Sequence, residues 1–236
     1  GQKYTPVDKD QVMYYREDKA GQILQEGINE AGGMASWIAA ATSYSTSNRI
    51  MIPFYVYYSM FGFQRIGDLA WAAGDMQARG FLLGGTSGRT TLNGEGLQHE
   101  DGHSHILANT IPNCVSYDPT FAHEVAVIMQ DGLRRMVQNQ ENVFYYITLL
   151  NENYAMPGLQ PGTEQQIIKG MYQCKPGQKV PQSGLRVQLL GSGTILRESL
   201  FAQELLEKDW QIAADVWSCP SFNELTRDGQ NCERHN

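Results

Sequence analysis

The densest group of side chains that could do chemistry lies between His99 and His105. It holds three imidazoles, from His99, His103 and His105, and two carboxylates, from Glu100 and Asp101. Such groups can bind a metal ion or move protons. The spacing fits no standard zinc pattern, and the HExxH motif is absent. We keep three interpretations open: a catalytic or substrate-contacting loop, which we favour, a metal site, and a solvated polar loop.

A long polar loop rich in glycine precedes this segment. It runs from Gly84 to Gly96 and lacks the Gly-Lys-Ser/Thr sequence of a phosphate-binding loop. Structureless loops of this length inside compact domains are uncommon and are usually functional. The loop therefore favours a role in substrate contact or catalysis for the histidines that follow it.

Glu30 is a second candidate. Asn29 is a residue type that favours helix N-caps, which places Glu30 in a first helical turn, where the helix dipole stabilises a carboxylate. We interpret residues 25–30 as the point where a strand turns into a helix, and on this pattern alone we favour a simple capping role. Gly32 and Gly33 weaken the helix but permit close approach of a flat or bulky group.

An aromatic run leaves a strand and enters a helix a little further on. Its members are Tyr55, Tyr57, Tyr58, Phe61 and Phe63. Most such side chains belong to the core. Because ligands of parallel sheets bind beyond the carboxyl ends of strands, we expect one residue between Tyr58 and Phe61 to form a stacking wall.

Apolar runs and helical periodicities alternate along the first two thirds of the chain. The β-prone runs are 52–58, 81–83, 114–117 and 143–150, and the helix-like segments span 63–73 and 121–136. Continuous strands that alternate with helices predict an α/β fold, with a mostly parallel sheet covered on both faces.

The pattern changes after residue 151. Proline and glycine cluster in 152–184, which we interpret as a linker with one short helix near 164–171. A second α/β unit follows in 185–236, with strands expected at 185–190 and 215–219. Two strands are too few for an independent sheet, so we expect the chain to be a piece of something larger.

The composition excludes several classes of protein. The chain has 236 residues, of which 42% are hydrophobic, and a net charge of −7, which argues against disorder, a general nucleic-acid binder and a membrane-surface role. The longest apolar run, 51–63, is too short to cross a bilayer core of about 30 Å. Four widely spaced cysteines without a CxxC pair, and no signal peptide, favour a reduced, cytoplasmic protein.

Four segments together carry a resemblance to a known family. They are Gln25 to Glu30, Tyr58 to Asp68, Gly84 to His105 and Asp228 to Arg234. They closely resemble the homodimeric bacterial pyruvate dehydrogenase component, a thiamine-diphosphate-dependent decarboxylating enzyme, and the resemblance covers essentially the whole chain. More distantly, the chain is similar to transketolase, which shares the glutamate and the Glu-Asp-Gly…His segment.

The resemblance implies a parallel-sheet thiamine-diphosphate-binding fold followed by the start of a transketolase-type C-terminal α/β domain. On this basis 1–20 is a mobile active-site loop, 21–151 the pyrimidine-binding domain, 152–184 a linker, and 185–236 the incomplete C-terminal domain. The family's Gly-Asp-Gly…Asn motif for Mg²⁺ and diphosphate does not occur in this sequence. We therefore expect no metal ligand in this chain and place Mg²⁺ on a segment outside it.

The resemblance also implies roles for individual residues. Glu30 matches the glutamate that activates the cofactor by sharing a proton with its aminopyrimidine ring, and Phe61 matches the aromatic residue that stacks on that ring. Tyr58 and His99 match side chains that hydrogen-bond the pyruvate-derived adduct. The remaining matches are His105, with the catalytic histidine shared with transketolase, and Glu95, with a cofactor-binding residue that supports the loop.

These matches imply a function for the intact protein. It would decarboxylate pyruvate with thiamine diphosphate and acetylate lipoamide on a lipoyl acyltransferase partner, as a homodimer whose active site lies between subunits. The fragment alone would be inactive. The alternatives are another 2-oxo acid decarboxylating enzyme of the transketolase superfamily, a metal-dependent hydrolase that uses His99 to His105, and a non-catalytic interaction domain.

Overall fold

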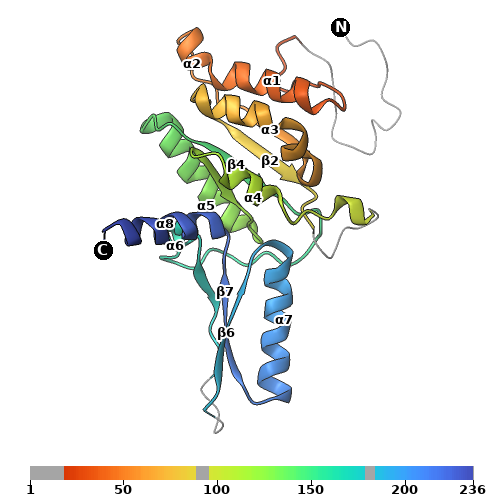
Figure 1. Cartoon of the computed structure of the whole chain (residues 1–236). Helices are drawn as coiled ribbons and strands as arrows, with labels where there is room; N and C mark the ends of the chain where they lie inside the picture. Colours follow the sequence, from red (N-terminus) through yellow and green to blue (C-terminus); the bar gives the residue numbers. More distant parts are fainter. Residues whose placement is uncertain (1–18, 89–95, 179–183, 236) are drawn as a thin grey trace.

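The computed structural model describes residues 19–88, 96–178 and 184–235, and it forms two α/β parts (Figure 1). Glu95 and nearly all of the expected active-site loop at 1–20 lie outside the described residues. Within the described ranges, no helix is both long and apolar enough to span a membrane.

The first part is built on a parallel sheet of four strands in the order β1-β2-β4-β3. The strands are β1 (Phe54–Tyr58), β2 (Phe81–Gly85), β3 (Cys114–Tyr117) and β4 (Phe144–Thr148). Their register brings Tyr58 opposite Gly85, and Gly84 opposite Thr148. The carboxyl ends of the strands therefore meet at one edge, and the predicted parallel sheet is confirmed.

Helices cover both faces of this sheet. Because successive residues of a strand point to opposite faces, neighbouring residues of one strand pack in different cores. Leu82 packs in one core with residues of α1 (Glu30–Ala41), α3 (Ser59–Asp75) and α4 (Ser104–Asn109). Phe81 and Leu83 pack in the other core, with residues of α5 (Ala122–Leu133) and α6 (Glu164–Lys169). The short helix α2 (Ser43–Thr46) follows α1, and a π-helical turn (Arg134–Gln138) extends α5.

Gly33 allows α1 to pack closely against β1. A Cβ atom at this position would lie 2.7 Å from the ring of Tyr55, so only glycine allows this helix–strand contact. The flat group that the glycine pair admits is thus a side chain of the protein itself. The described residues before Glu30 contain no strand, so our interpretation of a strand-to-helix turn at 25–30 is wrong.

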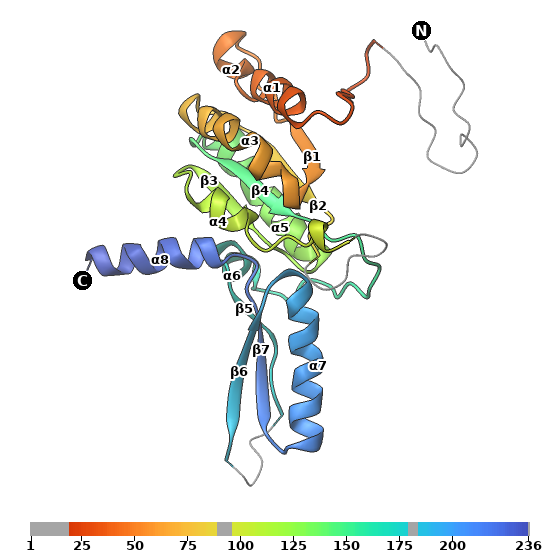
Figure 2. The ribbon, with the colours of Figure 1, turned by 45° about the vertical axis from the view of Figure 1, so that its right-hand side comes forward.

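The second part is a three-stranded sheet in the order β5-β7-β6. Strand β6 (Arg186–Gly191) pairs parallel with β7 (Ala213–Ser218), and β5 (Tyr172–Lys175) pairs antiparallel with β7. Helix α7 (Gly193–Asp209) packs along β6 and β7, as Figure 2 shows. We expected two strands here and missed β5, so residues 164–175 are not a plain linker: α6 joins the first part's core and β5 the second sheet.

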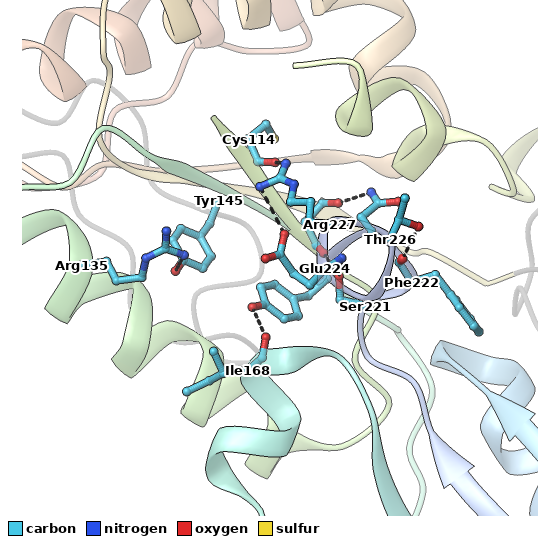
Figure 3. A network of polar contacts seen from close by, with 12 residues as sticks. Cys114, Arg135, Tyr145, Ile168, Ser221, Phe222, Glu224, Thr226 and Arg227 are labelled. Atoms are coloured by element: carbon cyan, nitrogen blue, oxygen red, sulfur yellow. Dashed lines mark hydrogen bonds and ion pairs between the residues drawn. The ribbon is translucent and has the colours of Figure 1, made fainter. Parts of the chain in front are cut away.

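Helix α8 (Phe222–His235), which the sequence analysis did not anticipate, docks on β3 of the first sheet (Figure 3). The Arg227 guanidinium donates to the Cys114 carbonyl at 2.6 Å, and the Ser221 hydroxyl donates to the Ser116 carbonyl at 2.6 Å. Burial raises the pKa of Glu224 against the opposing effect of Arg227. The chain thus returns from the second sheet to pack against the first.

A buried carboxylate joins the two parts. Glu124, in the first turn of α5, is fully buried and caps its own helix by accepting from the backbone N–H groups of Thr120 at 2.6 Å and Phe121 at 3.0 Å. It also accepts from the Tyr172 hydroxyl of β5 at 2.9 Å and the Ser218 hydroxyl of β7 at 2.6 Å. All four donors are neutral. Together they replace the hydrogen bonds with water that the carboxylate loses on burial.

Candidate active site

Three of the predicted aromatic and imidazole side chains meet at the carboxyl edge of the first sheet. Tyr58 is the last residue of β1, and Phe61 lies in the first turn of α3, which begins at Ser59. The His99 ring, from the 3₁₀ turn Leu97–His99, lies edge-on at 5.5 Å from the Tyr58 ring and 5.2 Å from the Phe61 ring. Tyr58 is 49% exposed, so this cluster offers an aromatic surface to a ligand.

Glu30 begins α1, as the sequence predicts. Asn29 is the N-cap, and its side chain accepts from the Gly32 backbone N–H at 3.1 Å. The Glu30 carboxylate makes an ion pair with Arg65 of α3. Burial, with smaller effects of the Glu30 and Glu26 charges, raises the pKa of the neighbouring Tyr55 hydroxyl, which donates to the Glu30 carbonyl at 3.3 Å.

Arg65 connects Glu30 to the aromatic cluster. Its guanidinium carbon lies 4.7 Å from the centroid of the Phe61 ring, within the range of a cation–π contact, while its Nη1 donates to the Glu30 carboxylate. The Arg65 guanidinium, a flat group with N–H donors, thus lies over the Phe61 ring and donates at its edge to Glu30. The Arg65 side chain is 52% exposed.

The three imidazoles of the His99 to His105 segment have separate partners. The His103 Nε2 lies 2.7 Å from the side-chain nitrogen of Gln64, whereas the His105 Nε2 lies 2.9 Å from the Thr148 hydroxyl. Within the described ranges, no group of three or more histidine, cysteine, aspartate or glutamate side chains could hold a metal ion. The segment thus distributes its imidazoles around the edge of the sheet.

Asp101 organises the start of α4. Its carboxylate accepts from the backbone N–H of Ser104 at 3.0 Å and of His103 at 3.1 Å, and from the Ser104 hydroxyl. Burial alone would raise the pKa of Asp101, but the hydrogen bonds from Ser104 and His103 outweigh it and hold this pKa below its usual 3.8.

We expect Asp101→Asn to destabilise the protein by about 1–2 kcal/mol at neutral pH, because an amide cannot accept all three hydrogen bonds. A depressed folded pKa stabilises the native state above the unfolded value of 3.8 and loses that effect as pH falls through the folded value. The gap in thermal unfolding midpoint between wild type and variant should therefore shrink below about pH 4. A gap that stays constant down to about pH 2 would contradict this account.

Three polar residues at this edge were not predicted from the sequence. Arg65 follows Phe61 by four positions on one helix, a spacing that places both on the same face and could have revealed it. Asp118 follows β3 directly, and Thr148 ends β4. Polar residues at the carboxyl ends of buried strands are the signal that could have found both.

The fold is an α/β fold similar to that of transketolases. The chain superposes on transketolase from Campylobacter jejuni with a TM-score of 0.65 at 20% identity, covering 85% of this chain and 28% of that chain. Transketolase from Leishmania mexicana gives a TM-score of 0.63 at 16% identity, covering 85% and 27%. Residues 170–235 match the transketolase-like C-terminal domain.

Sequence similarity places the chain more narrowly. Residues 1–157 match the pyruvate dehydrogenase E1 component middle domain, and the chain belongs to this family. It is 67% identical over 236 residues to the pyruvate dehydrogenase E1 component of Pseudomonas aeruginosa, and 67% identical over 237 residues to that of Escherichia coli K12. Both alignments cover the whole chain, which spans about a quarter (26%) of the length of these relatives.

Proposed function

We propose that this chain is the pyrimidine-binding part, with the start of the C-terminal domain, of an enzyme that decarboxylates pyruvate with thiamine diphosphate. The relatives that are 67% identical carry the name pyruvate dehydrogenase E1 component, which supports the substrate and the reaction class. The observation that carries the proposal in the molecule is the Arg65 guanidinium, stacked on Phe61 and bound by Glu30.

The aminopyrimidine ring of thiamine fits this arrangement. Like a guanidinium, it is flat and carries N–H groups at its edge, so Phe61 can stack on its face while Glu30 holds a proton at its ring nitrogen. When bound, thiamine diphosphate supplies the carbon nucleophile and the electron sink for decarboxylation. Glu30 is suited to the proton role because only 18% of its side chain is exposed.

Other residues around the edge complete the proposal. Tyr58 and His99 present a hydroxyl and an imidazole beside Phe61, where they can hydrogen-bond a substrate. We assign His105, at the start of α4, to proton transfer at the same edge. Glu95 stays a proposed cofactor-binding residue of the polar loop.

The partners of the intact protein belong to this proposal as well. They are a second copy of the chain in a homodimer and the lipoyl acyltransferase that accepts the acetyl group. Mg²⁺ and the diphosphate would be held by a segment outside this chain, and the protein would work in the cytoplasm. Residues 21–151 would form the pyrimidine-binding domain.

Calorimetric titration of the intact protein with thiamine diphosphate tests the site. Two variants are expected to change the dissociation constant in opposite directions. Phe61→Ala removes the stacking surface and should weaken binding by roughly 5- to 100-fold, since base–aromatic stacking is worth about 1–3 kcal/mol. Arg65→Ala removes a competitor for the same surface and should tighten binding by roughly 3- to 10-fold, from an exposed ion pair and a cation–π contact worth about 1 kcal/mol together.

Arg49→Ala is the matched control, because it removes an exposed arginine elsewhere in the first part and should leave the dissociation constant unchanged. Weaker binding in Arg65→Ala would mean that Arg65 holds the cofactor. Unchanged binding in both Phe61→Ala and Arg65→Ala would reject this surface as the pyrimidine site.

A further inference from the structure

A line of hydrogen-bonded side chains connects His105 to the second α/β part. His105 Nε2 lies 2.9 Å from Thr148 Oγ1, at the carboxyl end of β4. The Thr148 hydroxyl donates to Asp118 Oδ1 at 2.6 Å, and the Ser192 hydroxyl donates to Asp118 Oδ2 at 2.8 Å. Since Ser192 is the N-cap of α7, the line runs from α4 across the first sheet into the second part.

The direction of each proton follows from the chemistry of these groups. A carboxylate only accepts hydrogen bonds, so Thr148 and Ser192 must both donate to Asp118. The Tyr117 carbonyl also lies near Thr148 Oγ1, at 3.3 Å, but the shorter contact to a charged acceptor takes the single hydroxyl proton. The Thr148 oxygen is then left with lone pairs alone for His105. The His105 Nε2 must therefore carry a proton, which makes Nδ1 the basic nitrogen of the neutral ring.

The surroundings of His105 hold the ring and the backbone in place. The ring lies 5.1 Å from the ring of Tyr146, which is fully buried. The His105 carbonyl accepts from the Asn223 side chain of α8 at 2.9 Å. Thr148 is itself fully buried, so water does not compete for its hydroxyl. A fixed ring with one defined basic nitrogen is what proton transfer requires of a histidine.

The Asp118 end of the line is fixed by the backbone as well. The Gly193 N–H donates to the Asp118 carbonyl at 3.0 Å, and the Asp118 N–H donates to the Pro220 carbonyl. Gly193 has a φ of +50°, and a Cβ atom there would lie 2.7 Å from the Asp118 carboxylate. The tight turn before α7 thus brings the second part against Asp118 at close range.

We infer that Thr148 and Asp118 are positioning residues that fix the Nε2-protonated tautomer of His105, and that the N-terminal turn of α7 holds Asp118 for this task. The inference rests on the proposed function for the role of His105 in the reaction. The tautomer is argued separately from that role, from the contacts of Thr148 with His105 and Asp118. The line of hydrogen bonds from Ser192 to His105 gives the second α/β part a direct effect on the carboxyl edge of the first sheet.

A double-mutant cycle in the intact protein tests the reaction side. Thr148→Val keeps the shape but removes the hydroxyl, and we expect it to lower kcat for pyruvate decarboxylation by roughly 10- to 100-fold with little change in KM, by analogy with the loss of a hydrogen-bond partner that orients a metal-bound histidine. Thr148→Ser should restore kcat to within about threefold of wild type, because it keeps the hydroxyl. In a His105→Gln background, Thr148→Val should cause no further loss.

The control for the cycle is Thr110→Val, which removes a threonine hydroxyl at the far end of α4 and should leave kcat unchanged. Equal losses from Thr148→Val with and without His105 would overturn the inference, as would failure of Thr148→Ser to rescue.

Nitrogen NMR of the intact protein labelled at its histidine rings tests the tautomer without any turnover. The His105 signals, identified by their loss in His105→Gln, should report a proton on Nε2 in the wild type and a tautomer mixture in Thr148→Val. A wild-type proton on Nδ1 would overturn the inference even in an active enzyme. If the protein does not decarboxylate pyruvate but the Nε2 proton is found, the proposed function fails and the positioning of His105 stands.

Discussion

Replacement of Glu30 by glutamine should lower the turnover of the intact protein with pyruvate by roughly 10²- to 10⁴-fold, the usual range for a group that transfers a proton. Glutamine keeps the length and an acceptor oxygen but cannot hold the proton at the ring nitrogen. The substitution also removes the ion pair with Arg65, which competes with the cofactor for the same surface. This loss of competition offsets part of the lost contact, so binding of thiamine diphosphate should change far less than turnover. CO₂ release in single-turnover experiments, with the cofactor saturating, gives the measurement.

Glu26→Gln provides the matched control for this variant. Glu26 lies in the same segment, is exposed, and accepts a hydrogen bond from the Ser36 hydroxyl of α1. Its turnover should stay within about twofold of wild type, as for most exposed polar changes. Equal activity of Glu30→Gln and wild type would remove Glu30 from the chemistry and leave it as a helix-capping carboxylate.

Glu124→Ala should produce the largest structural effect, a loss of about 3–5 kcal/mol in the free energy of opening the junction between the two parts, because each buried donor left without an acceptor costs about 1–3 kcal/mol. The substitution removes the acceptor of two backbone N–H groups of the α5 cap and of the Ser218 hydroxyl, and it leaves the Tyr172 hydroxyl with His123 Nε2 at 3.1 Å. Hydrogen exchange of the Thr120 and Phe121 amides should speed up by roughly 100- to 4,000-fold, because each 1.4 kcal/mol is about tenfold.

Glu198→Ala serves as the comparison, since it removes an exposed glutamate from the middle of α7. Its effect should stay within about 0.5 kcal/mol. Exchange at Thr120 that is equally slow in Glu124→Ala and wild type would show that the buried carboxylate does not hold the two parts together.

Strands β2, β3 and β4 of the first sheet could be predicted because they are short, mostly apolar runs with nearly every residue buried. Strand β1 at the edge of the sheet is an apolar run as well, although Phe54, Val56 and Tyr58 are exposed. Phe144 to Ile147, for example, are all aromatic or β-branched, and none of them is exposed. Strand β5 could not be found in this way, because Tyr172 is its only fully buried residue and prolines and glycines surround it. Helix α8 was hidden for a related reason: it is strongly polar and has no buried residue, since only one side touches the sheet.

The site was predictable to the extent that single residues carry it. Glu30, Phe61, Tyr58 and His99 were predicted from the resemblance, and the geometry brings Phe61, Tyr58 and His99 into ring contact. The roles of Arg65, Thr148 and Asp118 depend on contacts between residues 30 to 74 positions apart, which no local pattern shows. Tertiary contacts of this kind decide which ring nitrogen carries a proton and which cation meets which carboxylate.

A structure of the intact protein with thiamine diphosphate bound is the most direct test of the central claim. The account predicts the aminopyrimidine ring flat against Phe61, with its ring nitrogen within hydrogen-bond distance of the Glu30 carboxylate and the Arg65 guanidinium displaced. An Arg65 side chain that remains between Phe61 and Glu30, with the pyrimidine ring bound elsewhere, would contradict it.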